Sequence, residues 1–450
     1  IIKNIYFLFS IFYFTFLSES RKRLGNFYGE ERSGYMKQKL GLMVLMVLAF
    51  FLITTPGYSA STDELERKIN ILSDEVDDLK SRGMGAGTSD HNRVSVHGYG
   101  EMHFNHNTSS GTTQIDNHRF VIGVHALLSD WIHLNAEIDF EHAAQELEFE
   151  FGYLDFLLNP ALNIRAGVML APVGLLNETH EPNLFWTSER PLLQSRMIPT
   201  TWTAGGVGLF GTPMEGVNYR LYAMNSLQSI TADTTANGSG SGGNGGSGDQ
   251  FGTNGIRGGR KQVNDAIADD FSVFARVELT KLYPGLQLGF SWVNGDTTHN
   301  LIEEDGNMNL LEADIKYRWN WFDMNASIVN TSVDNTLELN RFCASQACSG
   351  GIAENNFGYN VQAGVHLPQL LGWKTSHDII PHFMFERVRT QDKLNGETAP
   401  DYSKNRNAVY TFGVAYLPIP EVSLKVDHTV TNTEDGKTAD QFNMAIAYMY

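Results

Sequence analysis

From residue 93 to residue 450 the sequence alternates apolar and polar residues with a period of two, the pattern of β-strands with two different faces. In 310–320, for example, Leu311 and Ala313 lie on one face and Glu312 and Asp314 on the other. Each such segment has about 10 residues, the length at which a tilted strand crosses a membrane. We count sixteen: 94–105, 119–128, 132–141, 146–158, 162–170, 201–210, 217–225, 271–280, 286–293, 310–320, 324–331, 357–367, 378–388, 408–417, 422–430 and 441–450.

The connections between these segments alternate between short and long. Turns such as 129–130 and 159–160 have two residues, whereas the long, polar connections are 171–200, 226–270, 294–309, 332–356 and 389–407. Short turns at one end and long loops at the other are typical of outer-membrane barrels. The sequence therefore predicts an all-β fold, a transmembrane antiparallel β-barrel of about 16 strands over 93–450, with no other hydrophobic core. The Gly-rich loop 226–270 is expected to be exposed.

The residues before 93 are expected to serve export and spacing. Met36 is followed by two lysines, an apolar run over 40–54 and small residues at Gly57 and Ser59, which are the parts of a signal peptide. We therefore expect 36–60 to be a signal peptide and 1–35 to be upstream sequence that is absent from the gene product. The alternative is an N-terminal membrane anchor.

A heptad pattern follows the expected signal peptide. Its apolar residues are spaced 4, 3, 4 and 3 apart, which is the seam of a coiled coil. We expect a short coiled-coil helix over 61–82, in the periplasm, and a linker over 83–92. The alternative is a single amphipathic helix packed on its own domain. The seam residues are Leu65, Ile69, Leu72, Val76 and Leu79.

Several functional classes are disfavoured by composition and spacing. The formal net charge of −18 makes nucleic acid an unlikely partner, because phosphate binding needs a basic face. The 14 histidines form no HExxH motif or converging set, so we expect neither a metal nor another cofactor. No catalytic spacing is recognisable, and the chain is not expected to be an enzyme. A barrel enzyme and an adhesin or structural barrel remain as alternatives.

Charged residues at every second position must face water, and in a closed barrel that water fills the lumen. Six carboxylates are expected to form one wall of the lumen, and basic residues are expected to line it elsewhere. These charges either select solutes or pair with one another across strands. The acidic candidates are Glu137, Asp139, Glu141, Glu146, Glu148 and Glu150, and the basic ones are Arg119, Arg165, Arg220, Arg276, Lys316 and Arg318.

The stretch RAGVMLAPVGLLNETHEP from Arg165, with ERP from Glu189 and IPTTW from Ile198, resembles the phosphate-selective porin O and P family. With the heptads in front, the chain is also similar to trimeric DcaP-like porins. The resemblance implies a homotrimeric porin of the Gram-negative outer membrane, in contact with its lipid and passing small hydrophilic solutes or ions, anions among them. A third outer loop, about 171–200, would fold inward and narrow the barrel.

The same resemblance places six residues of this loop at the constriction. Glu189 and Arg190 either contact solutes or form a salt bridge that pins the loop to the barrel. The six carboxylates depart from the arginine ladder expected of phosphate-selective members. The constriction candidates are Glu178, His180, Glu181, Glu189, Arg190 and Arg196.

The two cysteines lie five residues apart in one of the long connections. Cys343 and Cys348 are expected to form a local disulfide, because an exported protein meets an oxidising environment. The alternative is a pair of free or metal-binding thiols.

Overall fold

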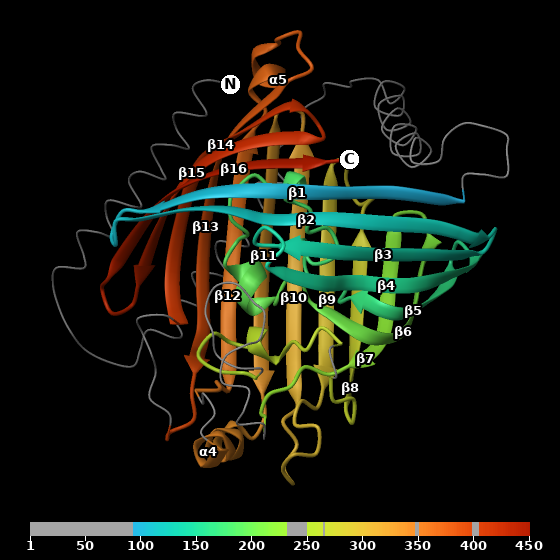
Figure 1. Ribbon diagram of the computed structural model, residues 1–450, viewed down its shortest axis with the longest axis vertical. Coiled ribbons are helices and arrows are strands. Elements are labelled where there is room, and N and C mark those ends of the chain that lie inside the picture. Colours follow the sequence, from blue (N-terminus) through green and yellow to red (C-terminus); the bar gives the residue numbers. More distant parts are fainter. Residues whose placement is uncertain (1–92, 232–249, 264–265, 347–350, 398–404) are drawn as a thin grey trace. The chain divides into compact units, whose positions relative to one another are not determined.

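The computed structural model describes residues 93–231, 250–263, 266–346, 351–397 and 405–450. In these residues sixteen antiparallel strands form one closed barrel, in which sequence neighbours pair and β1 closes against β16 (Figure 1). The predicted all-β barrel of sixteen strands is confirmed. The predicted upstream segment, signal peptide, coiled coil and linker lie outside the described residues.

Each observed strand coincides with one predicted segment, although many are longer. The longest, β2, begins at Thr112 instead of residue 119. The strands are β1 (Val94–Asn107), β2 (Thr112–Ser129), β3 (Ile132–Glu141), β4 (Glu146–Asn159), β5 (Leu162–Leu170), β6 (Thr203–Met214), β7 (Val217–Asn225), β8 (Phe271–Leu279), β9 (Leu286–Gly295), β10 (Met308–Trp319), β11 (Phe322–Val333), β12 (Asn355–Val365), β13 (Asp378–Lys393), β14 (Arg406–Ile419), β15 (Val422–Thr433) and β16 (Thr438–Met449).

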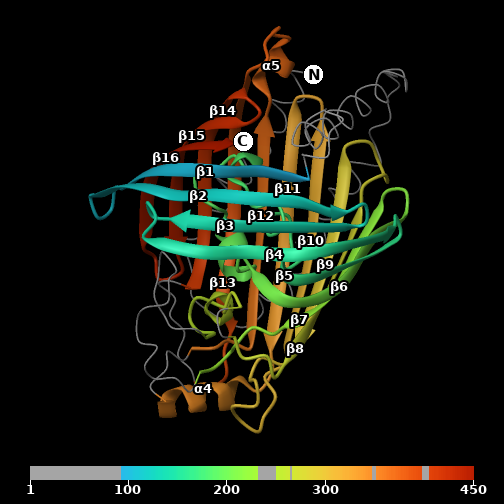
Figure 2. The ribbon, with the colours of Figure 1, turned by 45° about the vertical axis from the view of Figure 1, so that its right-hand side comes forward.

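We call the two ends of the barrel the long-loop end and the short-turn end. Helix α4 (Thr336–Gln346) follows β11 at the long-loop end, and the short helix α5 (Leu367–Leu371) follows β12 at the other (Figures 1 and 2). Sequence alternation did not indicate either helix. Among the described residues, no helix is long and apolar enough to cross a membrane.

The two faces of the barrel wall follow the predicted alternation over most strands. On β10, Leu311 is 52% exposed on the outside, whereas Glu312 is 4% exposed and faces the interior. Outward apolar side chains recur on neighbouring strands and suit contact with hydrocarbon. They include Val207, Leu221, Val273, Phe290, Ile328, Val361, Phe412, Leu424, Met444 and Ile446.

Two β-bulges away from the strand ends reverse the phase of this alternation. Asp139 pairs with Glu148, but Glu137 pairs with Phe151, so β4 carries one extra residue between these pairs. A bulge places two nearby residues of different parity on one face. The regular alternation predicted over 146–158 is therefore wrong beyond Glu150, and Phe151, Tyr153 and Asp155 face the interior. A second bulge sets His118 as the extra residue of β2 against β1.

The barrel interior also holds a hydrophobic core, so the prediction of no other core is wrong. Inward residues of β7 to β11 pack against the connections that follow β5 and β7. Leu227, Ile230, Phe251 and Ile256 of the second connection belong to this core, so these parts of it are not exposed as the sequence predicts, whereas 267–269 are exposed. Members include Met224, Phe274, Val293, Leu310, Val329, Leu193, Met197, Ile198, Leu227, Ile230, Phe251 and Ile256.

Candidate functional site

The connection between β5 and β6, residues 171–202, enters the barrel, and we call it the inward segment. It contains the 3-10 turn η1 (Pro182–Leu184) and the π-helical turn η2 (Leu193–Met197). Asn177 closes its base by donating from Nδ2 to the carbonyl oxygens of Ala171 (2.7 Å) and Trp202 (3.0 Å). The amide of Trp202 donates back to Asn177 Oδ1 at 2.8 Å. The two ends of the segment are therefore held together beside the wall.

One side of the inward segment is attached to β15. The buried ammonium of Lys425 donates to the carbonyl oxygens of Pro182 and Thr187, at 2.5 and 3.1 Å. It also lies 4.0 Å from the ring centroid of Phe185. The amide of Ser188 donates to a carboxylate oxygen two residues further along β15, in Asp427. A buried ammonium that binds two carbonyl oxygens and an aromatic face replaces most of its lost hydration.

Two glutamates attach the segment to β13 and β1. Glu386 on β13 accepts hydrogen bonds from the amides of Leu192 and Leu193, both at 2.9 Å. Glu189 of the segment accepts from Asn105 at 2.7 Å, and its Oε1 lies 3.2 Å from Nδ1 of His103. Both strand residues here lie on β1. The main-chain amides near η2 are thus satisfied by the barrel wall.

The opposite side of the segment is attached to β7 and β9. Glu178 Oε2 lies 3.0 Å from Nε of Arg220 on β7, which also bonds Glu278 on β8 at 2.9 Å. The amide of Gly174 donates to the hydroxyl of Ser291 on β9 at 3.3 Å. Burial raises the pKa of Glu178 above its usual range, although Arg220 opposes this shift. Contacts to β1, β7, β9, β13 and β15 show that the segment crosses the barrel interior, as the green ribbon in Figures 1 and 2 illustrates.

A polar cavity of about 540 Å³ lies between the inward segment and strands β1 to β7. Arg165 lines it and donates to both carboxylate oxygens of Asp155, at 2.7 and 2.9 Å. Its guanidinium also lies 3.9 Å from the ring centroid of Tyr153. The cavity contains charges of both signs. Its lining includes six of the predicted site residues, Glu137, Arg165, Glu178, His180, Glu181 and Arg220.

His180 connects the inward segment to β1 and β4 at the edge of this cavity. Its Nε2 lies 2.8 Å from the hydroxyl of Tyr99 and 3.0 Å from Glu150 Oε1. Burial opposes protonation of the imidazole, but Glu150 outweighs it and raises the pKa of His180. The protonated ring is therefore the form that the surrounding carboxylate stabilises.

The predicted wall of six carboxylates is partly neutralised by one arginine. Arg119 on β2 lies 3.0 Å from Asp139, 2.7 Å from Glu141 and 3.5 Å from Glu150. Arg276 on β8 has a similar arrangement further round the barrel and lies within salt-bridge distance of Glu278, Glu312 and Asp314. The alternative that interior charges pair across strands therefore describes these residues.

The connection between β7 and β8 also enters the barrel and packs against the inward segment, which sequence reasoning missed. Arg257 donates to the carbonyl oxygens of Ser195 (3.0 Å) and Thr200 (2.6 Å). Arg260 donates to that of Thr201 at 2.5 Å. Burial lowers the pKa of Arg260 to about 10. Two arginines near the end of a polar loop carry no sequence signal that would distinguish them from solvent-exposed charges.

The comparisons agree with this architecture at the level of fold. No family model matches the chain. An uncharacterized protein of Aquifex aeolicus (strain VF5) is 26% identical over 374 residues, which are 79% of this chain and 80% of that protein. Among solved structures, the outer membrane channel DcaP of Acinetobacter baumannii has a TM-score of 0.50 at 11% identity, covering 81% of this chain and 100% of that one. The chain has the fold of a porin.

A second porin has the same degree of likeness. The anion-selective porin from Comamonas acidovorans has a TM-score of 0.50 at 10% identity, covering 79% of this chain and 99% of that one. Identities this low show a shared barrel fold and carry no site residues across.

The remaining predicted residues are distributed around this porin fold. Arg190 donates to Thr201 at 3.3 Å, within its own segment, so Glu189 alone of the predicted pair has a described bond to the wall. Arg196 belongs to η2.

The other predicted residues lie on the barrel wall. Lys316 and Arg318 are exposed on β10 toward the short-turn end, away from the inward segment. Glu146 pairs with Glu141 in the strand register. Glu148 accepts from Gln262 at 2.8 Å.

The predicted disulfide cannot be compared directly with the structure. Cys343 is buried in α4, with Sγ 3.8 Å from Gln250 Oε1, whereas Cys348 lies outside the described residues. The disulfide therefore stays a prediction.

Proposed function

We propose that the chain is an outer-membrane porin that lets small hydrophilic solutes, anions among them, diffuse passively through a water-filled path narrowed by the inward segment. The observation that carries the proposal is the set of hydrogen bonds from this one segment to strands on opposite sides of the barrel. A segment held at both sides reduces the open cross-section and fixes which side chains a solute meets.

The position of the hydrophobic core supports an off-centre path. Several inward residues of β7 to β11, toward the long-loop end, are occupied by apolar packing, although β8 and β10 also carry the paired charges around Arg276. The cavity lies against β1 to β7 and carries charges of both signs. Water and polar solutes favour the second region. The path would pass Arg165, Glu178 and His180, the residues at which charge can select solutes.

The wider proposal includes cellular location and assembly. The apolar outer surface and the likeness to a solved outer membrane channel support the outer membrane. The resemblance to phosphate-selective and DcaP-like porins supports a homotrimer. The residue patterns support an export signal over 36–60 and a periplasmic coiled coil over 61–82. The paired carboxylates Asp139 and Glu150 give no support to strict phosphate selectivity.

Single-channel recording of the folded protein in a planar bilayer with a salt gradient tests this proposal. We expect stepwise conductance, arriving in threes if the assembly is trimeric, with a defined reversal potential. Well-folded protein that shows no conductance would reject the porin proposal and favour a barrel enzyme or an adhesin.

A further inference from the structure

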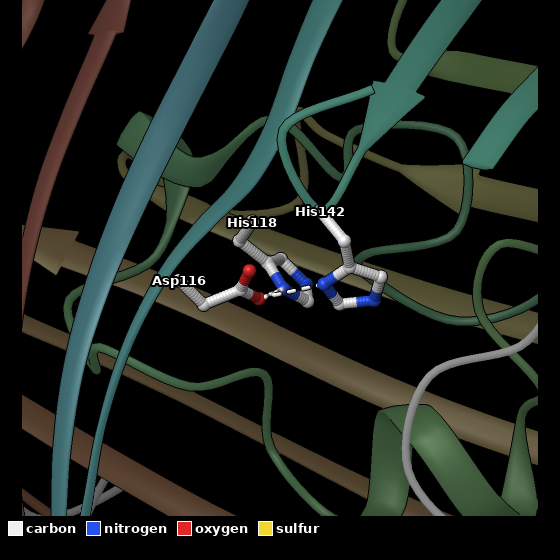
Figure 3. Close-up of side chains that lie close together, drawn as sticks. All are labelled: Asp116, His118 and His142. Carbon is white, nitrogen blue, oxygen red and sulfur yellow. Dashed lines mark hydrogen bonds and ion pairs between the residues drawn. The ribbon is translucent and has the colours of Figure 1, made fainter. Parts of the chain in front are cut away.

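A cluster of possible metal ligands lies inside the barrel near the long-loop end, where the sequence indicates no metal. Asp116 and His118 project from β2, and His142 from the turn after β3 (Figure 3). The Asp116 Oδ2 atom lies 3.2 Å from Nδ1 of His118 and 2.8 Å from Nδ1 of His142. One carboxylate oxygen therefore meets two imidazole nitrogens.

The strand register brings these residues together. Arg119 pairs with Glu141 across β2 and β3, so the next residue, His142, lies opposite His118. The amide of His142 donates to the carbonyl oxygen of His118 at 3.2 Å, which extends the pairing beyond the strand. His142 has a φ of 50°, in the left-handed region that few residues other than glycine adopt and in which histidine is enriched. The spacing of histidines along the sequence does not reveal this pairing.

We propose that Asp116, His118 and His142 bind one divalent transition-metal ion, with Zn²⁺ as the representative ion. Zinc bonds to imidazole and carboxylate are about 2.0–2.2 Å long, which puts neighbouring tetrahedral ligand atoms about 3.3 Å apart. The two measured separations need to open only slightly to reach this spacing. Calcium and magnesium prefer oxygen ligands and fit the set less well.

The surroundings of the cluster fit this role. The three side chains remain 24–33% exposed, so an ion can enter and water can take a fourth position. His103 stacks on His118 with ring centroids 4.7 Å apart, and its own nitrogens already face Glu101 and Glu189. It therefore orients the His118 ring as an outer partner and does not act as a ligand.

Two other ligand groups among the described residues fit a metal less well. Glu141, His142 and Glu146 form one, but Arg119 lies 2.7 Å from Glu141. Glu137, Glu150 and His180 form the other, and Arg119 also lies near Glu150, at 3.5 Å. A guanidinium beside a carboxylate competes with a metal cation for it. Asp116 shows hydrogen bonds from imidazoles only, as far as the described residues extend.

Binding needs no covalent step. In the absence of an ion, a ring that carries a proton on Nδ1 donates it in a hydrogen bond to Asp116. When the ion binds, each ring carries its proton on Nε2 and presents the Nδ1 lone pair. The ion then occupies the space between the three ligand atoms.

Isothermal titration of the full, folded protein with Zn²⁺ tests the site, using a purification tag without histidine and protein first stripped of metal. We expect one Zn²⁺ per chain. The variant D116N/H118Q/H142Q should lose this binding, and H142Q alone should weaken it by more than the roughly 10–100-fold cost of losing an outer-shell partner. The matched control H125Q/H133Q removes another pair of adjacent histidines, with ring centroids 5.3 Å apart, and should retain it.

The outcome does not depend on channel activity, because binding is measured without a membrane. Circular dichroism checks that each variant is folded, and His142 lies just beyond the end of β3. X-ray absorption at the zinc edge should show imidazole coordination that decreases in H142Q. Absence of stoichiometric binding to the wild type, or equal binding by the triple variant, would overturn the proposal.

Discussion

Glu189 of the inward segment lies 3.2 Å from the imidazole of His103 on β1, although 86 residues separate the two in the chain. Asn105 donates to the same carboxylate oxygen. The pair attaches the middle of the segment to the strand that closes the barrel.

Replacing Glu189 with Gln should loosen this attachment, because the amide keeps the shape of the side chain but loses its charge. We expect a severalfold increase in the frequency of current substates in single-channel recordings. The control E215Q removes a carboxylate that pairs with Lys281 in an exposed turn. An equal frequency of current substates in E189Q and E215Q would show that the contact between Glu189 and His103 does not hold the segment.

Replacing Glu386 with Ala should lower the free energy of unfolding by about 2–4 kcal/mol, because it leaves one buried and one part-buried amide without acceptors. Gln keeps one acceptor oxygen and should cost roughly half as much. Chemical denaturation of the detergent-folded protein measures both values. If E386A and E386Q lower the free energy of unfolding by the same amount, the paired hydrogen bonds to Leu192 and Leu193 contribute little.

Replacing Arg165 with Ala should shift the reversal potential in a salt gradient toward cation selectivity. The change removes a positive charge from the cavity and leaves the carboxylate of Asp155 without its bidentate partner. Arg190→Ala should shift the potential in the same direction. K281A, in an exposed turn, serves as a control of equal charge change. An unchanged reversal potential would reject both arginines as pore residues.

His180 should stabilise the fold more at acidic than at alkaline pH. Its pKa is raised on folding from about 6.5, so its contribution is complete below that value and is lost as the pH rises through the folded pKa. The destabilisation caused by H180Q should therefore shrink as denaturation is repeated from about pH 5 to pH 10. The control H106Q removes a partly exposed histidine of β1 outside this network. A destabilisation that grows with pH would contradict the assigned direction.

The strands could be predicted because each must present one apolar and one polar face over its whole length. On β10 the alternation of Leu311 with Glu312 continues without interruption, and the observed faces agree with it. The bulge at Glu150 could not be predicted, since an extra residue shows only against its partner strand. Regular alternation from Glu146 would place Tyr153 and Asp155 on the outer face, whereas the bulge turns them to the interior.

The interior core is indicated by apolar residues at inward positions, which are not informative when each strand is considered alone. Tyr222, Phe274, Val293 and Leu310 are apolar residues on otherwise polar faces, and the register places them side by side across β7 to β10. Each one alone resembles an irregularity. Only the aligned strands reveal a continuous apolar row.

The inward segment was predicted from a family resemblance, but its partners were not. Lys425 and Glu386 lie on distant strands, and their roles depend on where the segment passes. The same holds for His118 and His142, which meet only across the register of β2 and β3. Contacts of this kind require the closed barrel.

The attachments of the inward segment also constrain the order of folding. The amide of Ser188 bonds to Asp427, 239 residues later in the chain, and Glu189 reaches β1. These bonds cannot form until β15 is in place and the first and last strands have approached each other. The segment therefore reaches its final position late, after the strands that surround it. During assembly, the barrel would therefore first close with an open lumen, and the inward segment would narrow that lumen only afterwards.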